Sequence, residues 1–224
     1  MLDPQQTVAD VVLDHSECAA VFQRHHIDFC CRGDLSVEAA CERAGIDTDD
    51  LMSELSSAIA DRKRSSGDPR ALSTPALIHH IVAKHHGYLR ATLPFVQALA
   101  TKVSRVHGGH NPRLQELESL VHELSDVLRE HLDEEEDVLF PAMLAEPAED
   151  RVPIARALDT IQDEHLAVGS LLRRIRGATE EFALPEWACN SYRTLFSELE
   201  QLETDVFKHV HLENHVLMPR FAAA

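Results

Sequence analysis

The sequence predicts an all-α protein, in which an antiparallel four-helix bundle follows a small helical N-terminal domain. Glycine is scarce, with eight residues in 224. No stretch alternates apolar and polar residues as a half-buried strand does, whereas apolar residues recur every three or four positions through most of the chain. With 44% hydrophobic residues, the chain is long enough for one or two domains with their own cores.

Residues 1–64 are expected to form the small domain. Ser, Thr and Asp side chains that can cap helix N-termini recur through this stretch, and Gly45 ends the third predicted helix. A turn-like segment, 27–34, separates the second helix from the third and contains two adjacent thiols, Cys30 and Cys31. The predicted helix starts are Thr7 or Asp10, Ser16, Ser36 and Thr48.

Residues 65–73 form the predicted linker, because the stretch from Ser65 to Arg70 is small and polar and includes glycine and proline. The remaining residues, 74–224, are expected to form the bundle. Each of its four helices starts next to a proline, which fits a first helical turn because no N–H is needed there. The predicted starts are Thr74-Pro75, Asn111-Pro112, Val152-Pro153 and Leu184-Pro185, and the breaks are Gly108-Gly109, Pro147 to Asp150 and Gly177 to Leu184.

Histidine and glutamate lie on the apolar stripes of these helices. The second and fourth helices each carry a His-x-x-x-Glu pair on the stripe, and the first and third helices each carry one histidine. At a rise of ~1.5 Å per residue, three of the four helix connections place these residues at one height. The two pairs also begin a repeat, H-x3-E-x2-V-L-x-P, which indicates duplicated halves. The six residues are His86, favoured by the stripe over its neighbour His85, and His131, Glu135, His165, His209 and Glu213.

These six residues predict a centre with two metal ions. Ionised carboxylates in a bundle core are costly, so a cation must face them, and no lysine or arginine lies on the stripes at this height. Imidazole with carboxylate suits first-row transition metals, iron and manganese alike. Two octahedral ions can share both glutamates as bridges, together with an oxide or hydroxide. The alternative is that each His/Glu pair is only a surface contact between side chains one turn apart.

The charge of the chain argues against two classes of partner. A formal net charge of −17 repels nucleic acid and anionic membrane surfaces. The sequence has no basic and apolar leader and no run of ~18 apolar residues that could span a membrane. Five cysteines at irregular spacing fit reduced thiols better than a disulfide framework. We therefore expect a cytoplasmic protein that binds neither nucleic acid nor membranes.

In these residues the chain resembles the repair-of-iron-centres (RIC) family, in which a hemerythrin-like di-iron bundle follows a small domain with adjacent cysteines. The resemblance covers essentially the whole chain, from Asp28-Phe29-Cys30-Cys31 to the four bundle helices. It implies two non-haem Fe ions, joined by an oxo bridge and held at the six positions above. It also implies repair of iron-sulfur clusters damaged by nitrosative or oxidative stress, through iron donation. The implied partners are the damaged iron-sulfur proteins or their scaffold.

Two other functions are compatible with such a centre. One is a nitric oxide reductase, which would make the protein an enzyme, and the other is a sensor or carrier that binds NO or O2 without turnover. Oxygen-carrying hemerythrins have a fifth histidine ligand that this spacing does not clearly supply, which disfavours reversible oxygen carriage. Steady-state formation of nitrous oxide would identify the enzyme. The sequence leaves the oligomeric state open, with a homodimer as one alternative.

The adjacent cysteines are predicted as the catalytic pair outside the metal centre. A disulfide between sequence neighbours is strained and easily reduced, which favours a redox or transient metal-binding role for Cys30 and Cys31. The alternatives are ordinary thiols in a turn, or a zinc or iron site completed by His25 or His26. Our hypothesis is that the pair relays electrons or iron between the metal centre and a client.

Other residues are expected to have supporting roles. Glu164 can orient a histidine ligand or line an entry path, or it can be an ordinary surface acid. Cys18, Cys41 and Cys189 are expected as small buried side chains. Six histidines fall off the stripes and are expected at solvated or ligand-orienting positions: His15, His107, His110, His122, His211 and His215.

Overall fold

The computed structural model describes residues 2–60, 68–145 and 151–221 of the chain. Within these ranges all regular secondary structure is helical, and an isolated β-bridge joins Thr7 to Ser36. The predicted all-α class is therefore confirmed. By contacts the chain divides into two compact units, one formed by Met1–Leu77 with Phe207–Arg220 and the other mainly by Ile78–Val206.

Two of the four predicted helix starts near the N-terminus, Thr7 and Ser36, cap their helices, whereas Ser16 begins a 3-10 turn without a side-chain cap. The Thr7 side chain accepts a hydrogen bond from the backbone N–H of Asp10 at 3.0 Å, and Ser36 accepts one from Ala39 at 3.1 Å. Gly45 follows its helix with a φ of +70°, a left-handed conformation that glycine adopts without strain. The elements are α1 (Val8–Asp14), a 3-10 turn (Ser16–Cys18), α2 (Ala19–Arg24), α3 (Val37–Ala44) and α4 (Thr48–Ala60).

These short helices are stabilised by a common apolar core. Helices of this length are marginal in isolation, so their stability comes from the apolar surface that they bury against one another. Cys18 and Cys41 belong to this core, as predicted, and both are 0% exposed. The other fully buried side chains are Val8, Phe22, Val37, Leu51 and Leu55.

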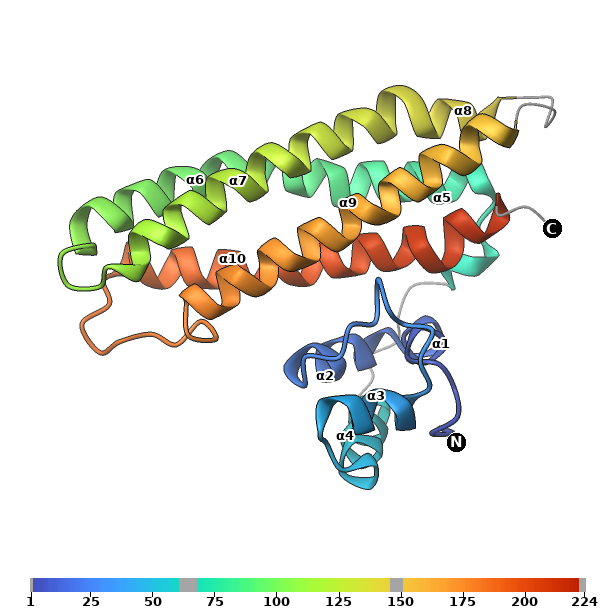
Figure 1. The fold of residues 1–224 in the computed structure, drawn as a ribbon, viewed down its shortest axis with the longest axis horizontal. Helices are drawn as coiled ribbons and strands as arrows, with labels where there is room; N and C mark the ends of the chain where they lie inside the picture. The colour runs from blue at the N-terminus through green and yellow to red at the C-terminus, as the bar shows by residue number, and fades with distance from the viewer. Residues whose placement is uncertain (1, 61–67, 146–150, 222–224) are drawn as a thin grey trace. The chain divides into compact units, whose positions relative to one another are not determined.

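The second unit is built from long helices that run side by side in alternating directions (Figure 1). α6 packs against α7, and α7 packs against α9. The Lys102 ammonium donates to the Ser191 hydroxyl at 3.0 Å and so links α6 to the start of α10. The elements are α5 (Thr74–Ile81), α6 (Gly87–His107), α7 (Arg113–Glu134), α8 (Phe140–Leu144), α9 (Arg151–Ala178) and α10 (Asn190–Leu212).

The last long helix begins at Asn190, later than the predicted start at Leu184-Pro185. The chain leaves α9 through residues 180–182, which all have positive φ values between 51° and 60°. Pro185 then lies in a turn, where its carbonyl accepts the N–H of Ala188 at 2.9 Å. Proline is favoured both in the first turn of a helix and in a tight turn of the chain. Here Pro185 belongs to a tight turn, so it does not mark the start of the helix.

Parts of the predicted boundaries lie outside the described residues, namely residues 61–64 at the end of the small domain, residues 65–67 of the linker and the break from Pro147 to Asp150. The described part of the linker includes a 3-10 turn, Pro69–Ala71, which the Asp68 side chain caps. Across the described ranges, no helix combines the length and the apolar character that crossing a bilayer requires.

Candidate metal centre

The six predicted ligands are deeply buried, each at most 3% exposed. They reach the interior because they continue the apolar stripes of their helices. On α7, Leu117, Leu124 and Leu128 are each 1% exposed, and the same face then presents His131.

One part of the cluster lies within Ile78–Val206. Glu135 Oε2 is 3.4 Å from His86 Nε2 and 3.5 Å from His131 Nε2. The His165 ring lies against the His131 ring, with 4.9 Å between the centroids. One carboxylate oxygen of Glu135 therefore lies near ring nitrogens from two helices.

The other part lies at the end of the last helix, where His209 Nε2 is 2.7 Å from Glu213 Oε1. Two groups of four buried side chains each bring their ligand-type atoms within 4.8 Å of one another. Glu135 and Glu213 occur in both groups, the first of which adds His86 and His209, and the second His131 and His165. The structure thus brings together all six predicted residues around two shared glutamates.

Three of the ligand-bearing helices contain a five-residue π-helical turn at the cluster. The turn Val82–His86 ends with a ligand, whereas the turns Glu135–Leu139 and Glu213–Leu217 each begin with one. A π turn holds one residue more than an α turn and is found mostly at functional sites. The extra residue rotates the following side chains by ~100° around the helix axis. Helical periodicity does not reveal these turns, because the inserted residue has no distinctive composition.

Carboxylates outside the cluster orient two of the ligand histidines. The Nδ1–H of His86 donates to Glu136 at 2.9 Å, and the Nδ1–H of His131 donates to Glu164 at 2.8 Å. Because an ionised carboxylate only accepts hydrogen bonds, the ring proton lies on Nδ1 and the Nε2 lone pair is left for the interior. The hydrogen bond from His131 holds the pKa of Glu164 below its usual value. Glu164 therefore has the orienting position that the sequence left open.

Glu136 is a functional residue that sequence reasoning missed. Arg90 Nη2 lies 3.0 Å from Glu136 Oε1 and 2.7 Å from Asp133 Oδ1. Burial alone would raise the pKa of Glu136, but the hydrogen bonds from His86 and Arg90 outweigh it and lower the pKa. Glu136 is one of five consecutive acids, and helical periodicity selected only Glu135 as inward-facing.

His85 is as buried as the ligands, with 2% exposure, but it belongs to neither group of four. Its Nδ1 lies 3.0 Å from Asp205 Oδ1. The structure therefore groups His86, and not its neighbour, with the other candidate ligands.

The donor set fits a pair of iron ions. Imidazole nitrogens with carboxylate oxygens suit first-row transition metals, and six protein donors exceed the four that a structural zinc takes. Two carboxylates within the same core require compensating positive charge. Glu135 and Glu213 would hold both cations, because each belongs to both groups of four.

The adjacent cysteines form a compact cluster with an aspartate. Cys30 Sγ and Cys31 Sγ are 3.5 Å apart, and Cys30 Sγ donates to Asp28 Oδ1 at 3.2 Å. The same oxygen accepts the backbone N–H groups of Cys30 at 3.2 Å and Cys31 at 2.8 Å. The hydrogen bond with Cys31 and then burial raise the pKa of Cys30 well above its usual value, so this thiol is protonated.

Side chains at the end of the last helix hold the backbone of the segment between α2 and α3 that contains Cys30 and Cys31, here called the cysteine loop. The Nδ1–H of His211 donates to the Phe29 carbonyl at 3.0 Å, and Asn214 and His215 both donate to the Cys30 carbonyl at 2.9 Å. Burial lowers the pKa of His211 to about 4, so its ring is a neutral donor at physiological pH. Sequence reasoning missed this role because it considered only one buried face of the helix.

Two other expectations are tested by the local contacts. His25 Nε2 lies 2.9 Å from Glu54 Oε1, so the structure brings Asp28, and not His25, to the two thiols. Cys189 is exposed rather than buried, because it precedes the first residue of α10, and its Sγ lies 3.2 Å from His107 Nε2.

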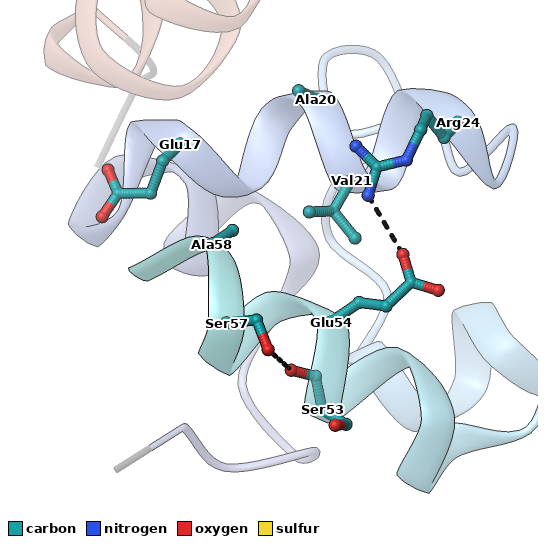
Figure 2. A pocket seen from close by; sticks show the side chains of 8 residues that line it. All are labelled: Glu17, Ala20, Val21, Arg24, Ser53, Glu54, Ser57 and Ala58. Carbon is teal, nitrogen blue, oxygen red and sulfur yellow. Dashed lines mark hydrogen bonds and ion pairs between the residues drawn. The ribbon is translucent and has the colours of Figure 1, made fainter. Parts of the chain in front are cut away.

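A hollow of ≈ 360 Å³ lies between α2 and α4 (Figure 2). Its lining includes Ala20, Val21 and Ala58, and also Arg24 and Glu54, which pair at 3.0 Å. None of its lining residues is a candidate metal ligand or one of the adjacent cysteines.

Comparison with known proteins gives two family matches and several full-length relatives. Residues 77–221 match the Hemerythrin HHE cation binding domain, and residues 4–59 match the Domain of Unknown function (DUF542). The chain is 30% identical over 223 residues to the iron-sulfur cluster repair protein ScdA of Staphylococcus haemolyticus, covering 99% of this chain and 100% of that protein. It is also 30% identical over 218 residues to the iron-sulfur cluster repair protein YtfE of Yersinia pseudotuberculosis serotype IB, covering 96% of each chain.

Proposed function

Since the chain belongs to the hemerythrin HHE family and, over its full length, to the iron-sulfur cluster repair proteins, we propose that it repairs damaged iron-sulfur clusters by donating iron. Its cofactor is a di-iron centre, and its targets are damaged iron-sulfur proteins. Nitrosative or oxidative stress is the proposed source of the damage, with NO and O2 as the small ligands of the centre.

The observation that carries this proposal is that one helix end serves both reactive groups. His209 and Glu213 face the metal cluster, while His211 and His215 hold the cysteine loop. Residues two positions apart lie ~200° apart around a helix, so the two sets project from nearly opposite sides. A bundle that only binds a gas has no use for thiols at its ligand helix. A protein that passes on iron does, because thiolate is a good ligand for iron in transit.

We assign the two irons to the six buried residues. When bound, they supply redox-active and exchangeable metal. The surrounding residues prepare the donors: Glu136 and Glu164 keep protons on Nδ1 of their histidines, and Phe140 stacks on the His86 ring with 5.7 Å between centroids, which excludes water. The proposed ligands are His86, His131, Glu135, His165, His209 and Glu213.

Cys30 and Cys31 are the proposed relay between this centre and a client. Cys30 is 3% exposed, whereas Cys31 is partly exposed, so the pair runs from the interior to the surface. A relay of iron or electrons to a client needs at least one thiol that the client can reach, and Cys31 meets this requirement. The proposal places the protein in the cytoplasm, because none of its five cysteines forms a disulfide.

Reactivation of a damaged client tests this function. A [4Fe–4S] dehydratase is inactivated with nitric oxide, and recovery of its activity is followed after addition of the iron-loaded protein. The variant with both Cys30→Ser and Cys31→Ser should keep its iron but lose the reactivation. Cys189→Ser, which removes an exposed thiol outside the loop, should behave as wild type. Unchanged reactivation by the double variant would remove the relay role.

Gas analysis of the same samples separates the other functions. Steady-state nitrous oxide production would move the assignment to a nitric oxide reductase. Binding of NO or O2 without any reactivation would move it to a sensor or carrier. Light scattering on the loaded protein distinguishes a monomer from a homodimer.

A further inference from the structure

The cysteine loop offers three ligand-type atoms of its own. One oxygen of Asp28, Cys30 Sγ and Cys31 Sγ all lie within 4.8 Å of one another. This cluster contains none of the six residues assigned to the irons. Its donors are also chemically different, because two of the three are sulfur.

We propose that Asp28, Cys30 and Cys31 form a second metal site, which binds one thiophilic divalent cation through two thiolates and one carboxylate. This inference deepens the proposed repair function. Only the site's role in passing on iron rests on that function. The binding itself rests only on the geometry of the loop.

The spacing of the two sulfurs suits a tetrahedral ion. Two thiolates bound at ~2.3 Å with a tetrahedral angle are ~3.8 Å apart. The observed separation of 3.5 Å is close to this value, so binding requires only a small side-chain adjustment. Binding releases the two thiol protons to solvent and forms two metal–sulfur bonds, with no change in oxidation state.

The loop is held in place before any metal arrives. His211 anchors the Phe29 carbonyl, and Asn214 and His215 anchor the Cys30 carbonyl. The Phe29 ring packs edge-on against Phe207 with 6.0 Å between centroids. A preorganised loop avoids the loss of conformational entropy that would otherwise oppose binding.

The far end of the loop is equally constrained. The N–H of Ala9 donates to the Gly33 carbonyl at 2.9 Å. A Cβ on Gly33 would lie 2.6 Å from the Phe29 carbonyl oxygen, so only glycine permits this close approach. Both ends of the chelating segment are therefore fixed.

Exposure leaves one side of the site accessible. Cys30 is buried, whereas Asp28 and Cys31 are only half-buried. Three protein donors leave a fourth position on a tetrahedral ion, which a ligand from another protein can take. This is the coordination expected of a site that accepts a metal and then gives it up.

Cobalt(II) is the probe that tests the site. The full-length protein, with its di-iron centre loaded, is titrated with Co2+ under anaerobic reducing conditions. We expect about one cobalt per chain and a near-ultraviolet thiolate-to-cobalt charge-transfer band. Cys31→Ser should remove most of this band. Asp28→Asn keeps an oxygen that can accept the two backbone N–H groups, and it should weaken cobalt binding by at least ~10-fold.

Matched controls separate ligation from unfolding. Asp34→Asn removes an exposed acid of the same loop and should leave the titration unchanged. Circular dichroism and an unchanged iron content show that each variant has folded. Absence of the band in wild type, or a band that persists in the Cys30→Ser, Cys31→Ser double variant, would overturn the site.

Two combined results keep this inference distinct from the repair function. In the first, the cobalt band is lost in the cysteine variants, but the double cysteine variant still reactivates the client. This result supports the metal site and removes its role in transfer. Thiol-dependent reactivation without a cobalt band overturns the site and leaves the repair function standing.

Discussion

The candidate iron ligands belong to long helices, whereas the adjacent cysteines belong to a loop between α2 and α3. The six ligands are each at most 3% exposed, and they continue apolar stripes that hold their helices together. The cysteine loop has no regular secondary structure, and it is held by hydrogen bonds to the carbonyls of Phe29, Cys30 and Gly33 and by the packing of one aromatic ring. The metal ligands are held mainly by the packing of their helices, whereas the cysteine loop is held mainly by individual hydrogen bonds.

This difference separates storage from transfer. A site whose ligands are part of the packed core opens only when a large part of the bundle opens. A short loop held by a few local contacts can open at a smaller free-energy cost than the core of the bundle. Substitutions in the cluster should therefore change the iron content, while substitutions around the loop should change the thiols and leave the iron in place.

The largest effect is expected for Glu135→Ala. Glu135 belongs to both groups of ligand atoms, so its removal should abolish binding of both irons. Iron analysis of the purified protein measures this. Glu134→Ala, at the exposed neighbouring position, should retain two irons per chain. A full iron complement in the Glu135→Ala variant would contradict the assignment of the shared carboxylate.

A smaller effect is expected for Gly33→Ala. The new Cβ would meet the Phe29 carbonyl oxygen at 2.6 Å and the Ala9 Cβ at 2.7 Å. The loop must shift, which should cost about 1–3 kcal/mol in the free energy of unfolding and speed alkylation of the adjacent thiols. Gly109→Ala is the matched control, because a Cβ there meets nothing within 4 Å. A loss of iron in the Gly33 variant would break the separation of the two regions.

Glu164→Gln tests the metal cluster alone, because it changes a carboxylate that orients a ligand histidine and leaves the cysteine loop untouched. The amide oxygen can still accept the His131 N–H, but the charge that strengthens this bond is lost. We expect roughly 10-fold weaker iron binding, measured by competition with a chelator, with no change in thiol reactivity. Asp163→Asn, its exposed neighbour, should have no effect. Equal affinities for the Glu164 variant and wild type would show that His131 needs no orienting carboxylate.

The smallest effect is expected for Asn214→Ala. It removes one of two hydrogen bonds to the Cys30 carbonyl and should cost about 1 kcal/mol, because His215 still donates to the same oxygen. Equilibrium unfolding and thiol alkylation rates are the measurements. Gln201→Ala on the exposed surface of α10 serves as the control. We expect faster thiol alkylation with an unchanged iron content. A lower iron content with an unchanged alkylation rate would contradict the assignment of Asn214 to the cysteine loop.

Most of the helices, and the inward faces that lead up to the metal cluster, could be predicted because local signals decide them. Thr7 and Ser36 cap their helices through their own side chains, and Gly45 adopts the backbone conformation that its lack of a Cβ permits. The stripe that leads from Leu128 to His131 is a property of one helix, so it could be predicted without knowing which helices pack against it. The grouping of all six candidate ligands followed from such stripes.

The remaining features depend on distant parts of the chain. Asn214 and His215 meet the Cys30 carbonyl across more than 180 residues, and no periodic pattern marks that contact. The start of the last helix depends on how residues 180–182 turn the chain, and proline alone did not reveal it. Asp28 became a candidate ligand only when the backbone of its loop was known.

The π-helical turns have a consequence for anyone who transplants this centre into another scaffold. Copying the six side chains onto four uniform α-helices would not reproduce it, because each extra residue resets the angular phase of everything beyond it. In Glu213–Leu217 the π turn begins at a cluster carboxylate and includes His215, which donates a hydrogen bond to the Cys30 carbonyl of the cysteine loop. A one-residue deletion there would change the direction of His215 relative to Glu213, so a replica of the site must copy the irregular backbone along with the ligands.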